Sequence, residues 1–273
     1  MQRKNKNTGI IPDTKQLSIQ FSLDGFSFCI QDVATKEIVS FTEYGFETPV
    51  STPELLQDEI ATIFEQDKEL QQDFKKVKAL HQNDLYTLVP NDYFDKKHLK
   101  TYLDFNIKTL TNDHITFDRI PTYEVRNVYV PFVNINNYLF QNFGEFEYYH
   151  HASVLIPNLL KYSENNTKTN FFVNVSNFSL DIVVIDSKKL LLANTFNYQT
   201  KEDFIYYILF VAEQLQLDPN EFQLTFIGAI EKESELYNIV YNYVRNVDFI
   251  QPSSTFLKNH DELSHHSNFT LIS

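Results

Sequence analysis

Hydrophobic and polar residues alternate near the start of the chain with the period of two that is typical of β-strands. The alternation covers Leu17–Phe21, Phe26–Ile30 and Ile38–Phe41. Between the first two segments, Leu23-Asp24-Gly25 predicts a tight hairpin turn. Thr52-Pro53-Glu54 then predicts a helix start, because it offers a capping hydroxyl, a proline in the first turn and an acid beside it. Apolar residues follow at helical spacing: Leu56, Ile60, Ile63 and Phe64.

The middle of the chain predicts shorter elements. We expect strands at Val77–Leu80, Tyr86–Val89, Ile115–Ile120, Tyr123–Val130 and Phe146–Tyr149. We expect helices at Tyr93–Phe105, at Val133–Phe140 and from Ser153 onward. Pro157 would then fall in the first turn of the third helix, where its missing N–H is tolerated.

The second part of the chain repeats the order of the first. Strands are expected at Phe171–Ser176, Leu180–Asp186, Leu190–Thr195 and Leu224–Ile227. Thr200 predicts a helix start, with Asp203 at the capping-box position. A second helical face is predicted by Leu236, Ile239, Val240, Tyr243 and Val247. The polar segment Tyr162–Asn170 marks the expected boundary between the two parts.

This repeat can be written as a gapless alignment of residues 17–32 with residues 171–186, a spacing of 154. Apolar residues then meet apolar residues at each inward position, while Ser22 meets Ser176 and Asp32 meets Asp186. Alternation alone is shared by any two hairpins, but the common order strand–strand–strand–helix–strand–helix favours a real internal repeat. We therefore expect a flexible lead-in at residues 1–14, a first half at 15–165, a second half at 166–252 and a polar tail at 253–273.

With these two halves, the chain resembles the actin-like (ribonuclease H-like) ATPase superfamily over residues 15–250. It resembles more closely a family of uncharacterised bacterial proteins with that fold, most of all at Tyr86–Pro90 and Asp181–Pro219. Within the superfamily it is similar to the branch of cell-division and pilus-assembly scaffolds. The resemblance implies a duplicated α/β fold of two βββαβα halves facing a cleft, with a small insertion in the first half around residues 110–130.

In active members of that superfamily, an acid and a glycine in each hairpin hold the metal-bound water and the phosphates. The resemblance places the first acid at Gln20 and its glycine at Ser22, and the second acid at Asn174 and its glycine at Ser176. Asp181 matches the last acid of the second motif, and Gly228 keeps half of the adenosine-contacting double glycine. An amide carries no charge and binds Mg²⁺ weakly beside a carboxylate, so we expect no catalysis and no ATP or Mg²⁺ cofactor, although both remain open.

Composition narrows the classes of partner. The formal net charge is −13 and only four residues are Arg, which argues against nucleic acid. The polar N-terminus Met1–Asp13 does not match a signal peptide, and the longest apolar run, Phe204–Ala212, is too short to span a bilayer. We expect a cytoplasmic protein without membrane insertion. The single cysteine, Cys29, lies in an apolar strand and is expected to be a buried core residue.

Other candidate chemistry is weak. The five glycines are scattered and form neither a P-loop nor a dinucleotide fingerprint. His150-His151 and the tail set His260, Asp261, His265 and His266 could suggest a metal, but adjacent histidines on a strand point apart. We interpret these histidines as solvated or incidental. The nearly all-apolar helix Phe204–Leu217 is interpreted either as buried between the sheet and another helix, or as an interface.

Three functional hypotheses remain. The first is a degenerate actin-like protein that binds a protein partner or scaffolds an assembly, with a homodimer possible. The second is a nucleotide-binding switch, or a slow ATPase or kinase, that uses Asp181 and Gly228. The third is an unrelated α/β interaction protein whose repeat is accidental. The missing acids favour the first.

Overall fold

The computed structural model describes residues 14–120, 123–164, 168–251 and 269–272. The chain divides into two compact units, at Val154/Leu155 inside helix α4 (His151–Ser163). The described residues up to Val154 form unit 1 and those from Leu155 onward form unit 2, to which Tyr123 is also assigned. No described helix is both long and apolar enough to cross a membrane.

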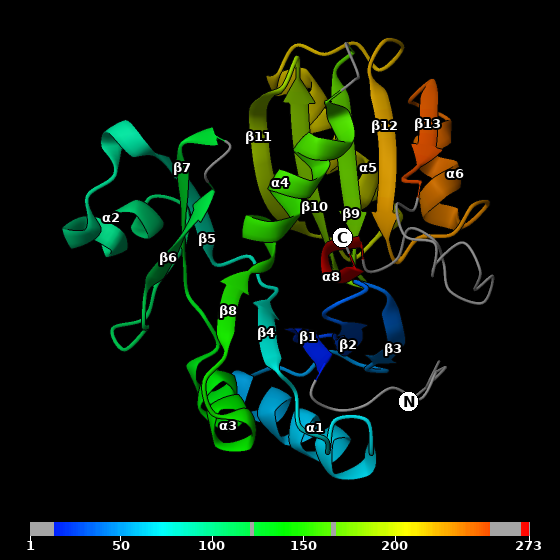
Figure 1. Ribbon diagram of the computed structural model, residues 1–273. Coiled ribbons are helices and arrows are strands. Elements are labelled where there is room, and N and C mark those ends of the chain that lie inside the picture. The colour runs from blue at the N-terminus through cyan, green and yellow to red at the C-terminus, as the bar shows by residue number, and fades with distance from the viewer. Residues whose placement is uncertain (1–13, 121–122, 165–167, 252–268, 273) are drawn as a thin grey trace. The chain divides into compact units, whose positions relative to one another are not determined.

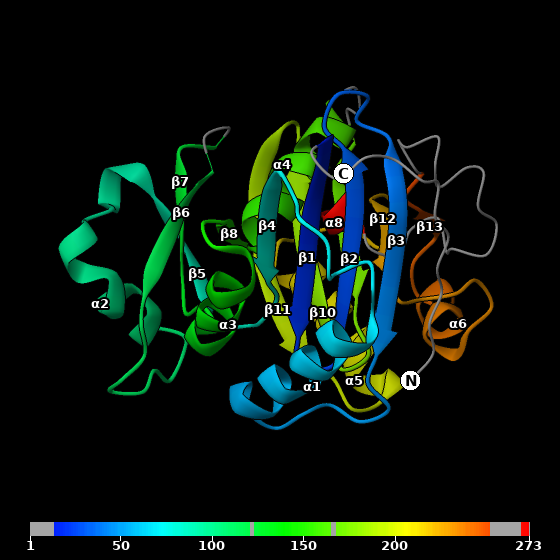
Figure 2. The same cartoon turned by 60° about the horizontal axis from the view of Figure 1, so that its bottom comes forward.

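Unit 1 is built on a five-stranded sheet in the order β3-β2-β1-β4-β8. Its strands are β1 (Lys15–Ser22), β2 (Gly25–Asp32), β3 (Ile38–Gly45), β4 (Lys76–His81) and β8 (Glu147–His150). The first three are antiparallel neighbours, and β4 and β8 add in parallel. Helices α1 (Pro53–Gln66) and α3 (Val133–Phe143) lie side by side on one face of the sheet (Figure 1, Figure 2). Leu56, Ile60 and Ile63 of α1 pack there against Ile19 and Phe28.

Between β4 and α3, unit 1 carries an insertion with a small core of its own. Its three-stranded sheet has the order β5-β7-β6, formed by β5 (Tyr86–Pro90), β7 (Val125–Tyr129) and β6 (Thr116–Ile120). The short helices η2 (Asn91–Tyr93), η3 (Lys96–His98) and α2 (Leu99–Asp104) stand where one helix over 93–105 was predicted. Tyr102 breaks that helix, because its hydroxyl donates to Tyr93 O (2.6 Å) and accepts from Asp95 N (2.8 Å). The insertion is therefore larger than the predicted residues 110–130.

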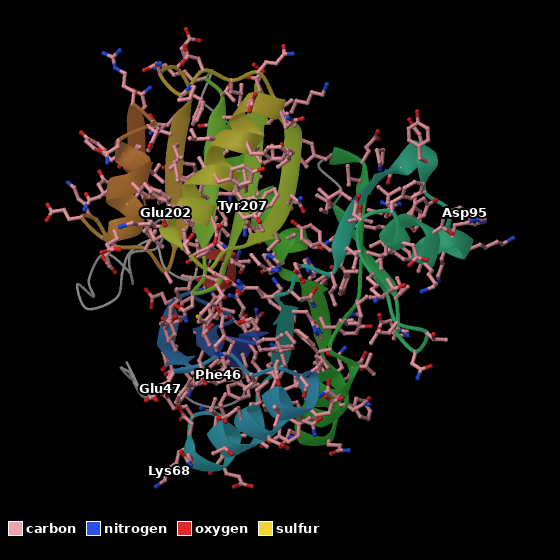
Figure 3. All side chains as sticks on the ribbon, turned by 180° about the vertical axis from the view of Figure 1, so that it is seen from behind. Phe46, Glu47, Lys68, Asp95, Glu202 and Tyr207 are labelled. Carbon is pink, nitrogen blue, oxygen red and sulfur yellow. The ribbon has the colours of Figure 1, made fainter. Side chains whose placement is uncertain are left out.

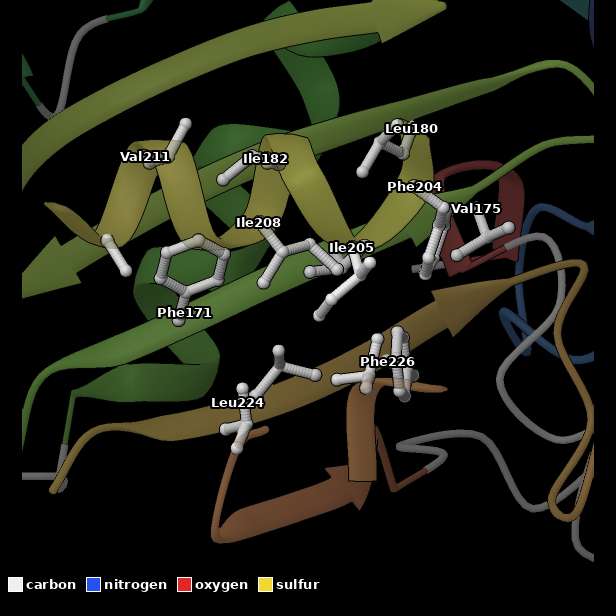
Figure 4. Close-up of a cluster of buried hydrophobic side chains, with 14 of the residues drawn as sticks. Phe171, Val175, Leu180, Ile182, Phe204, Ile205, Ile208, Val211, Leu224 and Phe226 are labelled. Carbon is white, nitrogen blue, oxygen red and sulfur yellow. The ribbon is translucent and has the colours of Figure 1, made fainter. Parts of the chain in front are cut away.

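Unit 2 repeats the main sheet in the order β11-β10-β9-β12-β13. Its strands are β9 (Asn170–Val175), β10 (Ser179–Asp186), β11 (Lys189–Asn197), β12 (Gln223–Gly228) and β13 (Asn246–Phe249). Helices α5 (Lys201–Gln214) and α6 (Glu235–Tyr241) follow the third and fourth strands, and α8 (Phe269–Ile272) is the last described element. Figure 4 shows α5 lying over the sheet, with Phe204 and Ile208 directed at residues of β9, β10 and β12.

The spacing of 154 residues holds in detail through the two hairpins. Phe21 pairs with Phe26 in unit 1, and their counterparts Val175 and Leu180 pair in unit 2. A register shift follows Ile30 in the pairing of β2 with β3, and another follows Val184, 154 residues later, in the pairing of β10 with β11. The two sheets therefore share strand order, direction and one irregularity.

Two predicted helices have different limits in the structure. Helix α4 begins at His151, directly after β8, so Pro157 lies inside it and not in the first turn. Helix α6 ends at Tyr241, and Val247 belongs to β13, because residues 246–249 pair in parallel with β12. The predicted capping box of Thr200 and Asp203 is present at the start of α5.

Helix α5 is buried against the sheet on one face, as the first interpretation of the apolar segment 204–217 expected, while its role as an interface stays a prediction. Phe204, Ile208 and Val211 are buried against the sheet. Tyr206 and Phe210, however, are exposed on the outer face, and their rings stack with centroids 5.8 Å apart. Figure 3 shows α5 from this outer side, with Glu202 and Tyr207 labelled.

Candidate functional site

In unit 2, three neighbouring strands bring Asn174, Asp181 and Thr195 to one line across the sheet. Asp181 pairs with Asn174 on one side and with Thr195 on the other. Asn174 Nδ2 donates to Asp181 Oδ2 (2.8 Å), and Thr195 Oγ1 donates to Asp181 Oδ1 (2.6 Å). Asp181 is only 4% exposed. Both oxygens of this carboxylate are therefore engaged within the sheet, at a buried position.

Gly228 lies at the end of β12, next to the same hairpin. It pairs with Val175 and has a φ of +86°. A Cβ added there would stand 2.2 Å from Val175 O and 2.9 Å from Asn174 Oδ1. Glycine is required by this close approach of two backbones and by the positive φ. The structure thus brings Gly228, Asn174 and Asp181 together.

Ser176 begins the loop of the second hairpin, and the loop is closed by its own hydrogen bonds. Ser176 N donates to Ser179 O (2.8 Å), and the hydroxyl of Tyr198 donates to Ser176 O (2.6 Å). Tyr198 N also donates to Phe178 O (3.0 Å). The Ser176 amide is therefore bonded within the hairpin, whereas phosphate binding by a backbone loop uses amides directed at the ligand.

The first hairpin holds Gln20 and Ser22 in a similar closed arrangement. Gln20 Nε2 donates to Gln82 Oε1 (2.8 Å), while Gln20 Oε1 is buried and accepts no hydrogen bond from a described residue. Ser22 Oγ donates to Asp24 Oδ1. Phe46 N donates to Asp24 O (3.1 Å), the counterpart of the bond from Tyr198 N to Phe178 O. At both predicted acid positions the side chain is an amide in contact with a neighbouring side chain.

A buried polar network in unit 1 was missed by the sequence interpretation. His150 and His151 are buried, and their rings lie 4.4 Å apart, because β8 ends at one and α4 begins at the other. The expectation of solvated, diverging side chains was therefore wrong. Asn127 Nδ2 lies 3.1 Å from His150 Nδ1 and donates to Ser153 Oγ (2.9 Å). Asp118 Oδ2 accepts from His150 N (2.9 Å).

The ionisable groups of this network have shifted pKa values. Burial lowers the pKa of His150 well below 6.5, and the neighbouring His151 lowers it further. Burial also raises the pKa of Asp118, although hydrogen bonds from His150 N and Ser153 oppose the shift. His150 Nε2 lies 3.1 Å from the carbonyl oxygen of Asn83, which an N–H can donate to, so the neutral ring carries its proton there. A neutral, fully bonded histidine links the insertion to the main sheet.

His81, at the end of β4, is a second buried histidine. Its Nδ1 accepts from Phe132 N (3.0 Å), so Nε2 carries the proton and donates to Asn136 Oδ1 (2.9 Å). Burial lowers its pKa to about 3, although the bond to Asn136 opposes the shift. Its position at the end of β4, directly after Ala79 and Leu80, was the available sequence signal, because a polar residue ending a buried strand needs a partner.

Metal binding finds no support among the described residues, which contain no group of three or more His, Cys, Asp or Glu side chains placed to hold an ion. The tail residues His260, Asp261, His265 and His266 lie outside the described part of the chain. Cys29 is buried, as expected, and burial raises the pKa of its thiol to about 12. The thiol is therefore protonated at neutral pH.

Comparison with known proteins identifies the fold and the family. The family described as "Protein of unknown function (DUF3822)" matches residues 4–247, so the chain belongs to it. A crystal structure from Bacteroides thetaiotaomicron, described as a protein with actin-like ATPase fold and unknown function, is similar with a TM-score of 0.80 and 23% identity. That match covers 91% of this chain and 96% of the other. This chain therefore has the actin-like ATPase fold, as the sequence predicted.

A second solved structure is described as the PilM–PilN type IV pilus biogenesis complex. It matches with a TM-score of 0.57 and 13% identity, covering 94% of this chain and 96% of that chain. No curated protein matches the chain in sequence. The predicted similarity to pilus-assembly scaffolds is thus confirmed at the level of the fold.

Proposed function

We propose that this member of the DUF3822 family is a non-catalytic actin-like protein that acts by binding a protein partner. The observation that carries the proposal is the hydrogen bonding of Asp181. Among the acid positions of the two phosphate motifs, it is the one that still holds an acid. Asn174 and Thr195 occupy both of its oxygens, and the residue is buried. Mg²⁺ is held through oxygen ligands, so a carboxylate fully bonded within the sheet is poorly suited to the task.

The first hairpin supports the same proposal. Gln20 is uncharged and bonded to Gln82, so neither hairpin offers an unbonded carboxylate at its acid position. Phosphoryl transfer depends on positioned charge around the transferred group, including metal ions that bridge the phosphates. Without an unbonded carboxylate at these positions, the chain keeps the two sheets of the fold but lacks the groups that would bind the metal and support phosphoryl transfer. The matching strand registers support an internal duplication as the origin of both hairpins.

Partner binding is supported by a structural neighbour and by composition. The PilM–PilN complex is, by its description, an assembly of two proteins, and one of its chains has a fold similar to that of this chain. A formal net charge of −13 favours a partner with a basic surface. The single cysteine, Cys29, is buried and cannot form an intramolecular disulfide, which favours a reducing compartment such as the cytoplasm. The partner in this proposal is another protein or a second copy of the chain.

A nucleotide-binding switch, or a slow ATPase or kinase, is the second candidate. It is favoured by the proximity of Gly228, Asn174 and Asp181, because Gly228 leaves no side chain at the strand end. The two candidates differ in one measurable property, the affinity for nucleotide.

Thermal unfolding with and without millimolar Mg²⁺·ATP or Mg²⁺·ADP tests the proposal. We expect the midpoint Tm to change by less than about 1 °C. A nucleotide at one hundred times its Kd would instead add about 2.7 kcal/mol and raise Tm by several degrees. Such a rise, lost in Asp181→Asn, would contradict the proposal and favour the switch. Affinity purification of the full chain tests the proposed partner binding, and we expect another protein to be retained in stoichiometric amount.

A further inference from the structure

Strand β11 forms an open edge of the five-stranded sheet in unit 2. It pairs with β10 on one side, and no described strand pairs with its other side (Figure 1). Tyr198 N donates to Phe178 O, and the direction of the backbone groups alternates along an antiparallel strand, so the backbone of Ala193 faces away from β10. Such an edge presents N–H and C=O groups to which a further strand can bond.

The other edge strands with similar exposure are each protected against pairing. Strands β8 and β13 have only four residues each. Strand β5 ends in Pro90, and β6 carries the charged residues Asp118 and Arg119. Short strands, prolines and charges are the means by which natural proteins keep sheet edges apart. Strand β11, in contrast, has nine residues, and its segment from Leu192 to Asn197 pairs regularly with β10 and contains neither a charge nor a proline.

Strand β3 holds the corresponding edge position in unit 1, and it is covered. Ser40 and Phe41 point to opposite faces of the sheet, and both are buried. Ser40 Oγ donates to Glu69 Oε2 (3.0 Å), and the hydroxyl of Tyr44 donates to Asp67 Oδ2 (2.6 Å), so the segment after α1 lies against β3. None of the nine residues of β11 is buried. The edge that is closed in unit 1 is therefore open in unit 2.

An exposed aromatic surface lies beside the open edge, on helix α5. The Phe196 ring of β11 stacks on that of Tyr207, with centroids 4.8 Å apart. Tyr207, labelled in Figure 3, lies 5.4 Å from Tyr206, which stacks on Phe210 at 5.8 Å. Tyr206 is 58% exposed and Phe210 is 39% exposed. The four rings form one apolar surface that runs from the edge strand onto the outer face of the helix.

The two ends of β11 differ in charge. Lys188 and Lys189, at its start, are exposed and form no ion pair with any residue that the structure describes. Beyond its other end, α5 begins with the exposed Glu202, while the neighbouring Lys201 is paired with Glu235 (3.5 Å). The strand thus starts at a basic end and leads to an acidic one.

We propose that β11 pairs antiparallel with β11 of a second copy of the chain, around a two-fold axis. This pairing joins the two sheets edge to edge and brings the basic end of each strand to the acidic end of the other. It also sets both α5 helices on the same face of the joined sheet, beside the axis, where Tyr206 and Phe210 become covered. The inference rests on the proposed function, because it names a second copy of the chain as the partner.

Sedimentation velocity of the full chain between about 1 and 200 µM, at about 0.15 M salt, tests the pairing. We expect a species of twice the chain mass, with a Kd below about 50 µM. Asn194→Lys places a charge at an exposed position near the axis, so it is expected to raise the Kd at least about tenfold and to leave Tm within about 1 °C. Asn112→Lys, exposed in unit 1, makes the same change of charge and should leave the Kd unaltered.

A second set of variants tests the aromatic surface. Tyr206→Gln with Phe210→Gln is expected to raise the Kd at least about fivefold, whereas Tyr93→Gln with Phe105→Gln, which are 77% and 82% exposed in unit 1, should not change it. A chain that is monomeric at every concentration, or equal effects of a variant and its control, would overturn the inference.

A different outcome would assign the edge to another occupant. If the chain were monomeric and retained another protein that Asn194→Lys releases, the edge would bind a strand of that protein, and the second copy would be ruled out. A monomeric chain that retains another protein regardless of Asn194→Lys would contradict this inference alone and leave the proposed function standing.

Discussion

The ends of β4 and β12 occupy the same place in the two sheets and are built in opposite ways. His81 pairs with Phe21 in unit 1, and Gly228 pairs with Val175, 154 residues after Phe21, in unit 2. The next residue makes the same bond in each case, from Gln82 N to Phe21 O (3.0 Å) and from Ala229 N to Val175 O (2.7 Å). The backbone frame is therefore common, while the side chain at its end differs.

The path of the chain after each strand explains this difference. After β4 the chain leaves for the insertion and returns at Phe132, whose N–H is bonded by the buried His81 ring. After β12 the chain turns at once, with a positive φ at Gly228 and a bond from Ile230 N to Gly228 O (3.0 Å). The same strand end thus anchors an inserted segment through His81 in unit 1 and begins a sharp turn at Gly228 in unit 2.

The sharpest way to break the comparison is to place a side chain at Gly228. Gly228→Ala is expected to lower the free energy of unfolding by at least about 3 kcal/mol, because the new Cβ would collide with Val175 O and because alanine disfavours the positive φ of this position. Urea denaturation followed by circular dichroism measures the loss.

Two other glycines provide matched controls. Gly144 also has a positive φ (+71°) but open space for Cβ, so Gly144→Ala isolates the backbone cost of about 1–3 kcal/mol. Gly45 has open space and no positive φ, so Gly45→Ala is expected to stay within about 0.5 kcal/mol. If Gly228→Ala cost no more than Gly144→Ala, the close approach of β9 and β12 would be ruled out.

A change of pH tests His81, the counterpart of Gly228 at the end of β4. The pKa of His81 falls from 6.5 to about 3 on folding, so the unfolded chain binds the proton more readily. The stability from the neutral ring is fully present above pH 6.5 and is lost as the pH falls toward 3. At pH 5 the expected loss relative to pH 7 is about 2 kcal/mol, measured by urea denaturation.

His81→Gln is the control for this titration, since it keeps a donor and an acceptor without ionising in this range. His150 and Asp118 titrate in both proteins, so their contributions cancel when the two are compared. The variant should be less stable at pH 7 and lose less stability between pH 7 and pH 5. An identical pH dependence in the two proteins would show that His81 does not sense the pH.

The smallest expected effect compares the caps of the corresponding helices α1 and α5. The hydroxyl of Thr52 accepts from Leu55 N (3.3 Å), and Leu55 has no polar side chain to return the bond, whereas Thr200 belongs to a reciprocal capping box with Asp203. Thr200→Ala is expected to cost about 1–2 kcal/mol and Thr52→Ala about 0.5–1 kcal/mol, both by thermal unfolding. The reverse order would mean that the box adds nothing to α5.

The strands and their repeat were predictable because alternation and turn residues are local signals. The hairpin register followed from matching Phe21 with Val175, and the capping box from Thr200 and Asp203 alone. The predicted site residues of unit 2 were also brought together, since Asn174, Asp181 and Gly228 lie on adjacent strands. Their mutual hydrogen bonds could not be inferred from the sequence.

Long-range contacts account for the features that the sequence did not indicate. The partners of His81 are Phe132 and Asn136, about fifty residues away across the insertion, so no local pattern indicates them. The helix predicted at 93–105 failed because the hydroxyl of Tyr102 bonds the backbone nine residues earlier.

The burial of Cys29 has a practical consequence. It is the single cysteine of the chain, it is 4% exposed, and its thiol pKa of about 12 leaves almost no thiolate at neutral pH. A maleimide dye would therefore react with cysteines introduced at exposed positions and not with Cys29. With Lys68→Cys in unit 1 and Glu202→Cys in unit 2, one donor and one acceptor fluorophore would report the separation of the two units in an otherwise native chain.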